Sequence, residues 1–224
     1  PDATVIVATI QALKRHGDGD LERGLPNLLR HVDTMTKVFG LNAVVAVNRF
    51  PADTDAEVEL VRSRCAELGA RAVVSEVWAR GGKGGIDLAE EVVRLCDEPS
   101  QFHFSYELDQ PLEAKIEAIA RRVYHADGVA FTDQARADLS ALTEHGFGGL
   151  PVCVAKTQYS FSDDPKLLGA PDGFTVTVRE LRVSAGAGFV VALTGAIMTM
   201  PGLPKSPAAT RIDVDADGVI SGLF

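Results

Sequence analysis

Short apolar runs of strand length alternate with amphipathic segments over the first hundred residues. The runs cover residues 4–8, 43–47 and 72–78. Helices are expected over 21–39, behind a capping box at 54–57, and over 87–96. Continuous apolar strands that alternate with helices pair in parallel, with both faces of the sheet covered. The N-terminal side is therefore predicted to be α/β, built of parallel βαβ units.

The alternation breaks at residues 97–100 (DEPS), so we place a boundary that divides the chain into domains 1–98 and 99–224. Beyond it, helices are expected over 112–123 and 133–145, and strands over 128–131 and 152–155. Apolar residues alternate from Phe174 to Val178 and resume one residue out of step at Leu181, which indicates a β-bulge. The C-terminal region is predicted to be mixed α+β and strand-rich.

One uncharged stretch, residues 183–204, has the length of a membrane helix. It contains four glycines and two prolines, and its β-branched residues form short groups. This composition predicts buried strands separated by turns, not a membrane span.

Composition narrows the classes of partner. Lys and Arg number 22 against 31 Asp and Glu, so the net charge of −9 argues against a nucleic-acid or anionic-membrane surface. Cys65, Cys96 and Cys153 are far apart and are expected to be buried free thiols in a reducing compartment. No signal peptide opens the sequence, and its start at Pro1 is interpreted as truncated. A cytoplasmic location is expected.

Two aromatic residues follow strands whose carboxyl ends should share one sheet edge, where ligands of parallel sheets bind. The second strand is followed by Asn48-Arg49-Phe50, and the third is expected to finish at Trp78. The pair predicts an aromatic clamp for a flat heterocycle, in which each stacked ring pair is worth about 0.5–1.5 kcal/mol. Asn48 and Arg49 would be its polar neighbours. Core or rim positions for both rings are the alternative.

A glycine-rich turn, Gly81 to Gly85, follows Trp78 and precedes a helix. Backbone N–H groups at a helix N-terminus suit a phosphate or carboxylate, so Gly82, Lys83, Gly84 and Gly85 are candidate anion-binding residues. A tight turn with a solvated lysine fits the sequence equally well. The spacing is not that of a Walker A loop.

Three other polar features stand out in the sequence. Residues 213–218 begin like a calcium loop, but Phe224 stands where a glutamate is required, so a β-hairpin with an Asp-Gly turn is expected. The five histidines show no metal spacing, and no metal site is predicted. Lys156 opens a polar cluster, KTQYS, at a strand end, which is either a site neighbour or a turn.

Several long motifs resemble formate–tetrahydrofolate ligase. They are residues 4–14, 45–54, 77–85, 150–160, 179–189 and 198–204. The resemblance runs over essentially the whole chain, which is similar to the C-terminal portion of that enzyme. It implies that the N-terminal half of that enzyme, with the ATP-binding P-loop, is missing from this sequence and is its partner in the site.

The resemblance implies a substrate site and a set of partners. Members of that family make 10-formyltetrahydrofolate from formate, ATP and tetrahydrofolate by way of formyl phosphate, and residues matching Phe50 and Trp78 sandwich the pterin. The full enzyme would use ATP with Mg²⁺ and a monovalent cation, with no cofactor bound tightly to this chain. A homo-oligomer is implied. No role is carried over to Lys83, and no catalytic residue is assigned. His125 and Ala196 stand where the family commonly has Gly and Asp, so the loss of that acid leaves a polar role at 196 in doubt.

Two classes of function fit these observations. The first is a ligase portion that carries the folate side of the site and works only with the nucleotide-binding half. The second is a non-catalytic folate-binding or assembly module that keeps the fold without the reaction.

Overall fold

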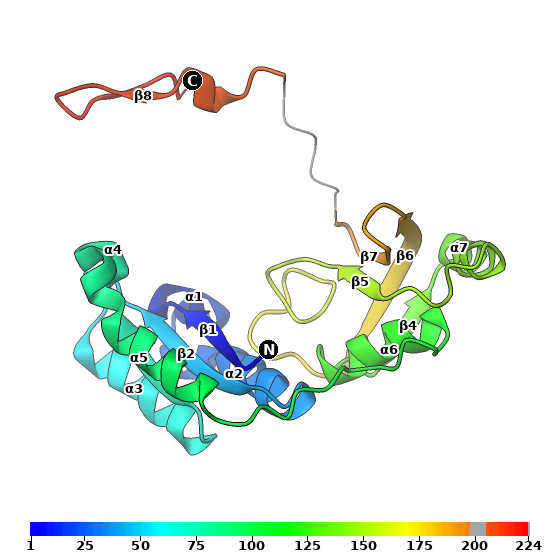
Figure 1. Cartoon of the computed structure of the whole chain (residues 1–224), viewed down its shortest axis with the longest axis horizontal. Coiled ribbons are helices and arrows are strands. Elements are labelled where there is room, and N and C mark those ends of the chain that lie inside the picture. The colour runs from blue at the N-terminus through cyan, green and yellow to red at the C-terminus, as the bar shows by residue number, and fades with distance from the viewer. Residues whose placement is uncertain (198–204, 224) are drawn as a thin grey trace.

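The computed structural model describes residues 1–197 and 205–223, and contains two larger sheets and one small hairpin (Figure 1). The motif at 198–204 and the residue compared with the end of a calcium loop, Phe224, lie outside the described residues. The prediction of parallel α/β units followed by a mixed, strand-rich region is confirmed.

The first sheet consists of three parallel strands, β1 (Ala3–Ala8), β2 (Asn42–Asn48) and β3 (Arg71–Ser75), in the order β1-β2-β3. Its helices are α1 (Ile10–His16), α2 (Leu21–Asp33), α3 (Asp55–Glu67) and α5 (Ile86–Cys96). One face packs against α1, α2 and α3, and the opposite face packs against α5. This burial on both faces explains why the strand sequences are continuously apolar.

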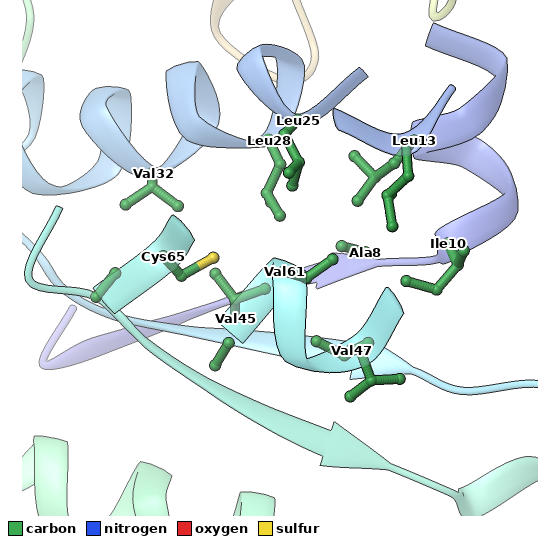
Figure 2. Close-up of a cluster of buried hydrophobic side chains, with 14 residues drawn as sticks. Ala8, Ile10, Leu13, Leu25, Leu28, Val32, Val45, Val47, Val61 and Cys65 are labelled. Atoms are coloured by element: carbon green, nitrogen blue, oxygen red, sulfur yellow. The ribbon is translucent and has the colours of Figure 1, made fainter. Parts of the chain in front are cut away.

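The larger core lies between β2 and the helices α1 to α3. Figure 2 shows Leu25, Leu28 and Val32 of α2 on one side of this core and Val45 and Val47 of β2 on the other. All five side chains are at most 3% exposed. Burial of apolar surface of this kind is the main source of stability, at about 25 cal/mol per Å², and it fixes the position of the strand ends.

Local signals set several helix boundaries. The capping box is confirmed, because Oγ1 of Thr54 accepts from the N–H of Glu57 at 3.3 Å and Oε2 of Glu57 accepts from the N–H of Thr54 at 2.9 Å. The helix expected over 21–39 consists of α2 continued by the π-helical segment η1 (Thr34–Val38). Helix α1, capped by Thr9, was not predicted, since seven residues carry too little periodicity.

The second sheet is mixed and consists of β4 (Gly128–Phe131), β5 (Val152–Ala155), β6 (Thr175–Ser184) and β7 (Phe189–Thr194). The order is β4-β6-β7-β5, with β6 and β7 antiparallel and the two outer pairs parallel. Helices α6 (Leu112–Arg122) and α7 (Asp133–Glu144) share a core with it. The predicted bulge is confirmed between Val178 and Glu180.

The uncharged stretch forms strands and turns as far as the structure describes it, with β7 following a turn at 185–188. Within the described residues, no helix combines the length and the apolar character that a membrane crossing requires. Near the C-terminus, η3 (Ala208–Thr210) precedes β8 (Asp213–Val214) and β9 (Ile220–Ser221). The two strands pair antiparallel around a turn in which Gly218 has φ +80°, so the predicted hairpin is confirmed.

Two expectations were wrong. The third strand ends at Ser75, where its pairing with β2 ends and the N–H of Glu76 donates to the carbonyl of Gly84 instead. Trp78 lies in the short helix α4 (Val77–Arg80). Of the three free thiols, only Cys65 is buried. Cys96 is exposed as the last residue of α5, and Cys153 is exposed on the edge strand β5.

Candidate substrate-binding site

The rings of Phe50 and Trp78 lie against each other just beyond the carboxyl ends of β2 and β3. Their centroids are 5.9 Å apart and their planes are inclined by 53°. Trp78 is 65% exposed, and Phe50 is half-buried. The expected proximity of the two rings is present, although Trp78 reaches this position from the short helix α4 and not from a strand end.

A tight turn holds Phe50 at the edge of the sheet. The N–H of Phe50 donates to Oδ2 of Asp53 at 2.8 Å, and the N–H of Asp53 donates to the carbonyl of Phe50 at 3.0 Å. Pro51 occupies the second position of this turn, where its fixed φ is favourable. The backbone at Phe50 is thus fixed on both sides.

Arg49, a predicted polar neighbour, is already engaged by the protein. Its backbone N–H donates to the carbonyl of Ser75 at 3.0 Å, which completes the last pair of the β2–β3 ladder, Asn48 with Ser75. Its guanidinium donates to Asp55 at 2.7 Å and to the carbonyl of Asp53 at 3.4 Å. Arg49 therefore links the aromatic edge to the first turn of α3.

The glycine run folds back toward Glu76 as the short 3₁₀ helix η2 (Gly81–Gly85). The N–H of Glu76 donates to the carbonyl of Gly84 at 2.9 Å. A Cβ on Gly84 would lie 2.4 Å from the carbonyl oxygen of Glu76, so this close approach requires glycine. Gly81, at φ +57°, provides the reversal between α4 and η2.

The candidate anion-binding residues lie directly before α5 and shortly after Trp78 in the sequence. Gly82 and Lys83 are exposed, and Gly84 and Gly85 are half-buried. Gly85 is the N-cap of α5, and no side chain caps the helix there. The 3₁₀ helix η2 runs directly into α5, so its i→i+3 hydrogen bonds engage backbone N–H groups of this turn.

Lys156 lies away from the aromatic pair, in a different pocket. Its ammonium donates to the carbonyls of Thr157 at 2.9 Å, Ser162 at 3.1 Å and also Ser160. Burial lowers its pKa to about 8, partly opposed by Asp163. With all three protons used on carbonyls, Lys156 fixes the path of its own loop.

The pocket around Lys156 has a volume of about 350 Å³ and separates α2 from the loop after β5. His16 and His31 also line it, and its described lining residues include no Asp or Glu. Burial holds the pKa of His31 below its usual value, with nearby cations adding to the shift, and burial followed by Arg15 does the same for His16. Sequence reasoning missed this basic pocket, because its members are far apart along the chain and share no motif.

Comparison with known proteins connects this geometry to an enzyme family. The sequence model of the family described as formate–tetrahydrofolate ligase matches residues 1–224. A curated formate–tetrahydrofolate ligase from Symbiobacterium thermophilum is 59% identical over 235 aligned positions. The alignment includes all of this chain but only 42% of that relative, so the chain spans about two-fifths of its length.

Proposed function

Because the chain belongs to the formate–tetrahydrofolate ligase family, we propose that it carries the folate-binding side of such an enzyme. The whole enzyme would convert formate, ATP and tetrahydrofolate to 10-formyltetrahydrofolate, ADP and phosphate. The observation that supports this role is the contact between Phe50 and Trp78 at the carboxyl edge of a parallel sheet, the edge at which such sheets bind ligands.

The pterin would enter between the two rings. A planar ring stacked on both faces needs about 7 Å between its neighbours, two contacts of about 3.5 Å. The rings are 5.9 Å apart and tilted, so binding requires them to separate and become more parallel. Trp78, which is largely exposed and carried by a four-residue helix, is the ring that moves.

Nucleotide chemistry would take place mainly on the rest of the enzyme. The 224 residues contain no GxxxxGK[ST] sequence, the usual cradle for the phosphates of ATP and its Mg²⁺. We assign ATP, Mg²⁺ and a monovalent cation to the partner half. The turn at 82–85 is proposed to approach an anionic group of the substrates. Residues 1–98 would form the folate-site segment and 99–224 a second domain.

Assembly with other chains follows from the edge of the first sheet. Strand β1 is an edge strand, on which Val5 is 40% and Val7 67% exposed. An open parallel edge with exposed valines favours association. We propose that this edge adjoins the N-terminal half in a cytoplasmic homo-oligomer, and light scattering of this chain alone is expected to give a dimer or larger species. A monodisperse monomer would contradict it.

Fluorescence and turnover together test the proposal. Folate should quench the emission of Trp78, the single tryptophan, and Phe50→Ala should weaken that binding. Phe102→Ala, which removes an aromatic ring outside the pair, is the control and should bind normally. The chain with formate, ATP, Mg²⁺, K⁺ and tetrahydrofolate should form no product until the N-terminal half is added. Folate binding without any activity in the mixture would favour the non-catalytic module. Absence of binding would refute the folate-site role and leave only an assembly module.

A further inference from the structure

Asn48 places a side-chain amide at the same sheet edge as the aromatic pair. It is the last residue of β2, and its register partner is Ser75, the last residue of β3. Side chains alternate along a strand, so Asn48 lies on the face of Val44, which is the face covered by α5. Phe50 follows Asn48 by two residues, and Trp78 follows Ser75 by three.

The side-chain oxygen of Asn48 is buried and accepts no hydrogen bond from the described residues. Two other buried oxygens without a hydrogen bond belong to Asp33 and Glu180. Each of these carboxylates is ion-paired, with Lys37 and Arg182 respectively. Within residues 1–197 and 205–223, Asn48 therefore has the one buried side-chain oxygen without a polar partner. Buried polar atoms are rarely left without a hydrogen-bond partner, and each exception calls for an explanation.

The other two asparagines of the sequence have structural hydrogen bonds. Asn27 donates to the carbonyl of Gly169 at 2.8 Å. Asn42, at the opposite end of β2, donates to the carbonyls of Asp2, Leu95 and Glu98 at 3.1–3.3 Å. Asn48 has no such use within the described fold, which leaves its amide free for a ligand.

The aromatic pair needs a residue of this kind. Stacking on Phe50 and Trp78 accepts many planar rings, because every heterocycle has a π-face. Discrimination between heterocycles comes from hydrogen bonds to the ring edge. A side-chain amide can bond to a neighbouring donor and acceptor at the same time. The pyrimidine ring of a pterin presents such an edge, with N3–H beside the 4-oxo group. Arg49 is less suited, since its guanidinium is held by Asp55.

We propose that Asn48 is a specificity-determining residue, whose Oδ1 accepts a hydrogen bond from N3–H of the pterin. The inference rests on the proposed function, in which the aromatic pair holds that ring. Replacing the 4-oxo group by an amino group turns N3–H into a lone pair, which would face Oδ1 without a proton between them. With the amide in the orientation that the structure gives it, in which Oδ1 is the buried atom, the site should prefer the 4-oxo ring to a 4-amino ring of the same shape.

The test compares folic acid with its 4-amino analogue, using quenching of Trp78 fluorescence to measure both affinities. The wild-type chain should bind folic acid more tightly. Asn48→Leu should lose about ten- to a hundred-fold in folic acid affinity, as expected when a buried partner is left unpaired, and the ratio of the two affinities should fall towards one. If the leucine variant does not fold, Asn48→Ala, which adds no bulk, should show the same loss of folic acid affinity and the same fall in the ratio.

Phe50→Ala is the matched control, because loss of a stacking partner should weaken both ligands and leave their ratio unchanged. If the wild-type chain binds folic acid but the Asn48 variants keep both its affinity and the ratio, this inference is overturned and the proposed function stands. If the wild-type chain binds neither ligand, the proposed function fails as well.

Discussion

The backbone N–H of Gly169 donates to Nδ1 of His16 at 3.1 Å, joining two residues 153 positions apart in the sequence. Nδ1 accepts this bond only when it carries no proton, so the neutral ring with its proton on Nε2 is the one that fits. Burial and, after it, the charge of Arg15 on the same helix lower the pKa of this ring, which favours the neutral form. The contact joins α1 to the loop after β5.

Stability should consequently fall with acidification. The pKa values of His16 and His31 are held below the usual 6.5, mainly by burial. The unfolded chain then binds more protons than the folded chain once the pH drops below 6.5. The contribution of the two neutral histidines to the free energy of unfolding is therefore complete above pH 6.5. It is lost as the pH falls through their lowered pKa values in the folded chain. The urea midpoint is expected to be lower at pH 5.5 than at pH 7.5.

His16→Asn tests whether His16 contributes to this trend. An asparagine can still accept from Gly169 but does not titrate, so the variant should show a smaller difference between the two pH values. His145→Asn, which replaces an exposed histidine, should leave the difference unchanged. Equal pH dependence in His16→Asn and wild type would refute the role of His16.

The packing of the loop at Gly169 against α2 allows a prediction of how much stability is lost when a buried hydrogen-bond donor is removed. Nδ2 of Asn27 donates to the carbonyl of Gly169 at 2.8 Å, and Asn27 is 9% exposed. Asn27→Ala leaves that carbonyl unpaired, at a cost of about 1–3 kcal/mol in the free energy of unfolding. Gln134→Ala removes an exposed amide that bonds only to Asp138, and should cost less than about 0.5 kcal/mol. Urea unfolding of both variants gives the comparison, and similar losses would contradict the prediction.

Thiol labelling should distinguish the three cysteines. Cys96 and Cys153 are exposed, whereas Cys65 is buried and burial raises its pKa to about 11. Only the thiolate reacts at an appreciable rate, so a maleimide at pH 7.5 should label two thiols in the folded chain and three in urea. Cys65→Ala should reduce the urea value to two and leave the folded value at two. Rapid labelling of Cys65 in the folded chain would show that α3 is packed less tightly against the sheet than described.

The sequence predicted those parts of the fold that are encoded locally. The capping box at Thr54 and Glu57 and the bulge near Val178 each depend on neighbouring residues, and both are confirmed. Trp78 shows the opposite case. Its apolar neighbours are typical of a strand, but a strand continues only where a partner continues, and β2 ends at Asn48. The end of a strand is thus decided by residues that are distant in sequence.

The same limit applies to the candidate site. Phe50 and Trp78 could be paired from sequence, because carboxyl ends of parallel strands converge at one edge. Lys156 follows a strand of the other sheet, so its position at a strand end carried no information about its distance from Phe50. The pocket of His16, His31 and Lys156 depends on the packing of a loop against two helices, which no spacing rule describes.

The glycine run provides a matched pair of substitutions next to Trp78. A Cβ on Gly84 would lie 2.4 Å from the carbonyl oxygen of Glu76, whereas a Cβ on Gly82 would meet no atom within 4 Å. Gly84→Ala must therefore push η2 away from Glu76 and break the hydrogen bond between these two residues. We expect it to cost about 1–3 kcal/mol, which corresponds to a loss of roughly 2–12 °C in Tm for a chain of this size.

The fluorescence of Trp78 shows whether this turn positions the aromatic ring or contributes only to stability. Because α4 precedes the glycine run directly, displacement of η2 should also move the ring of Trp78 away from Phe50 and change its fluorescence emission in the folded state. Gly82→Ala should retain the wild-type Tm and emission, since its side chain would lie in open space. If Gly84→Ala unfolds at a lower temperature but quenches with folate as the wild type does, the turn contributes to stability without positioning the aromatic pair. If both alanine variants behave alike, the close approach at Glu76 is not a feature of the protein in solution.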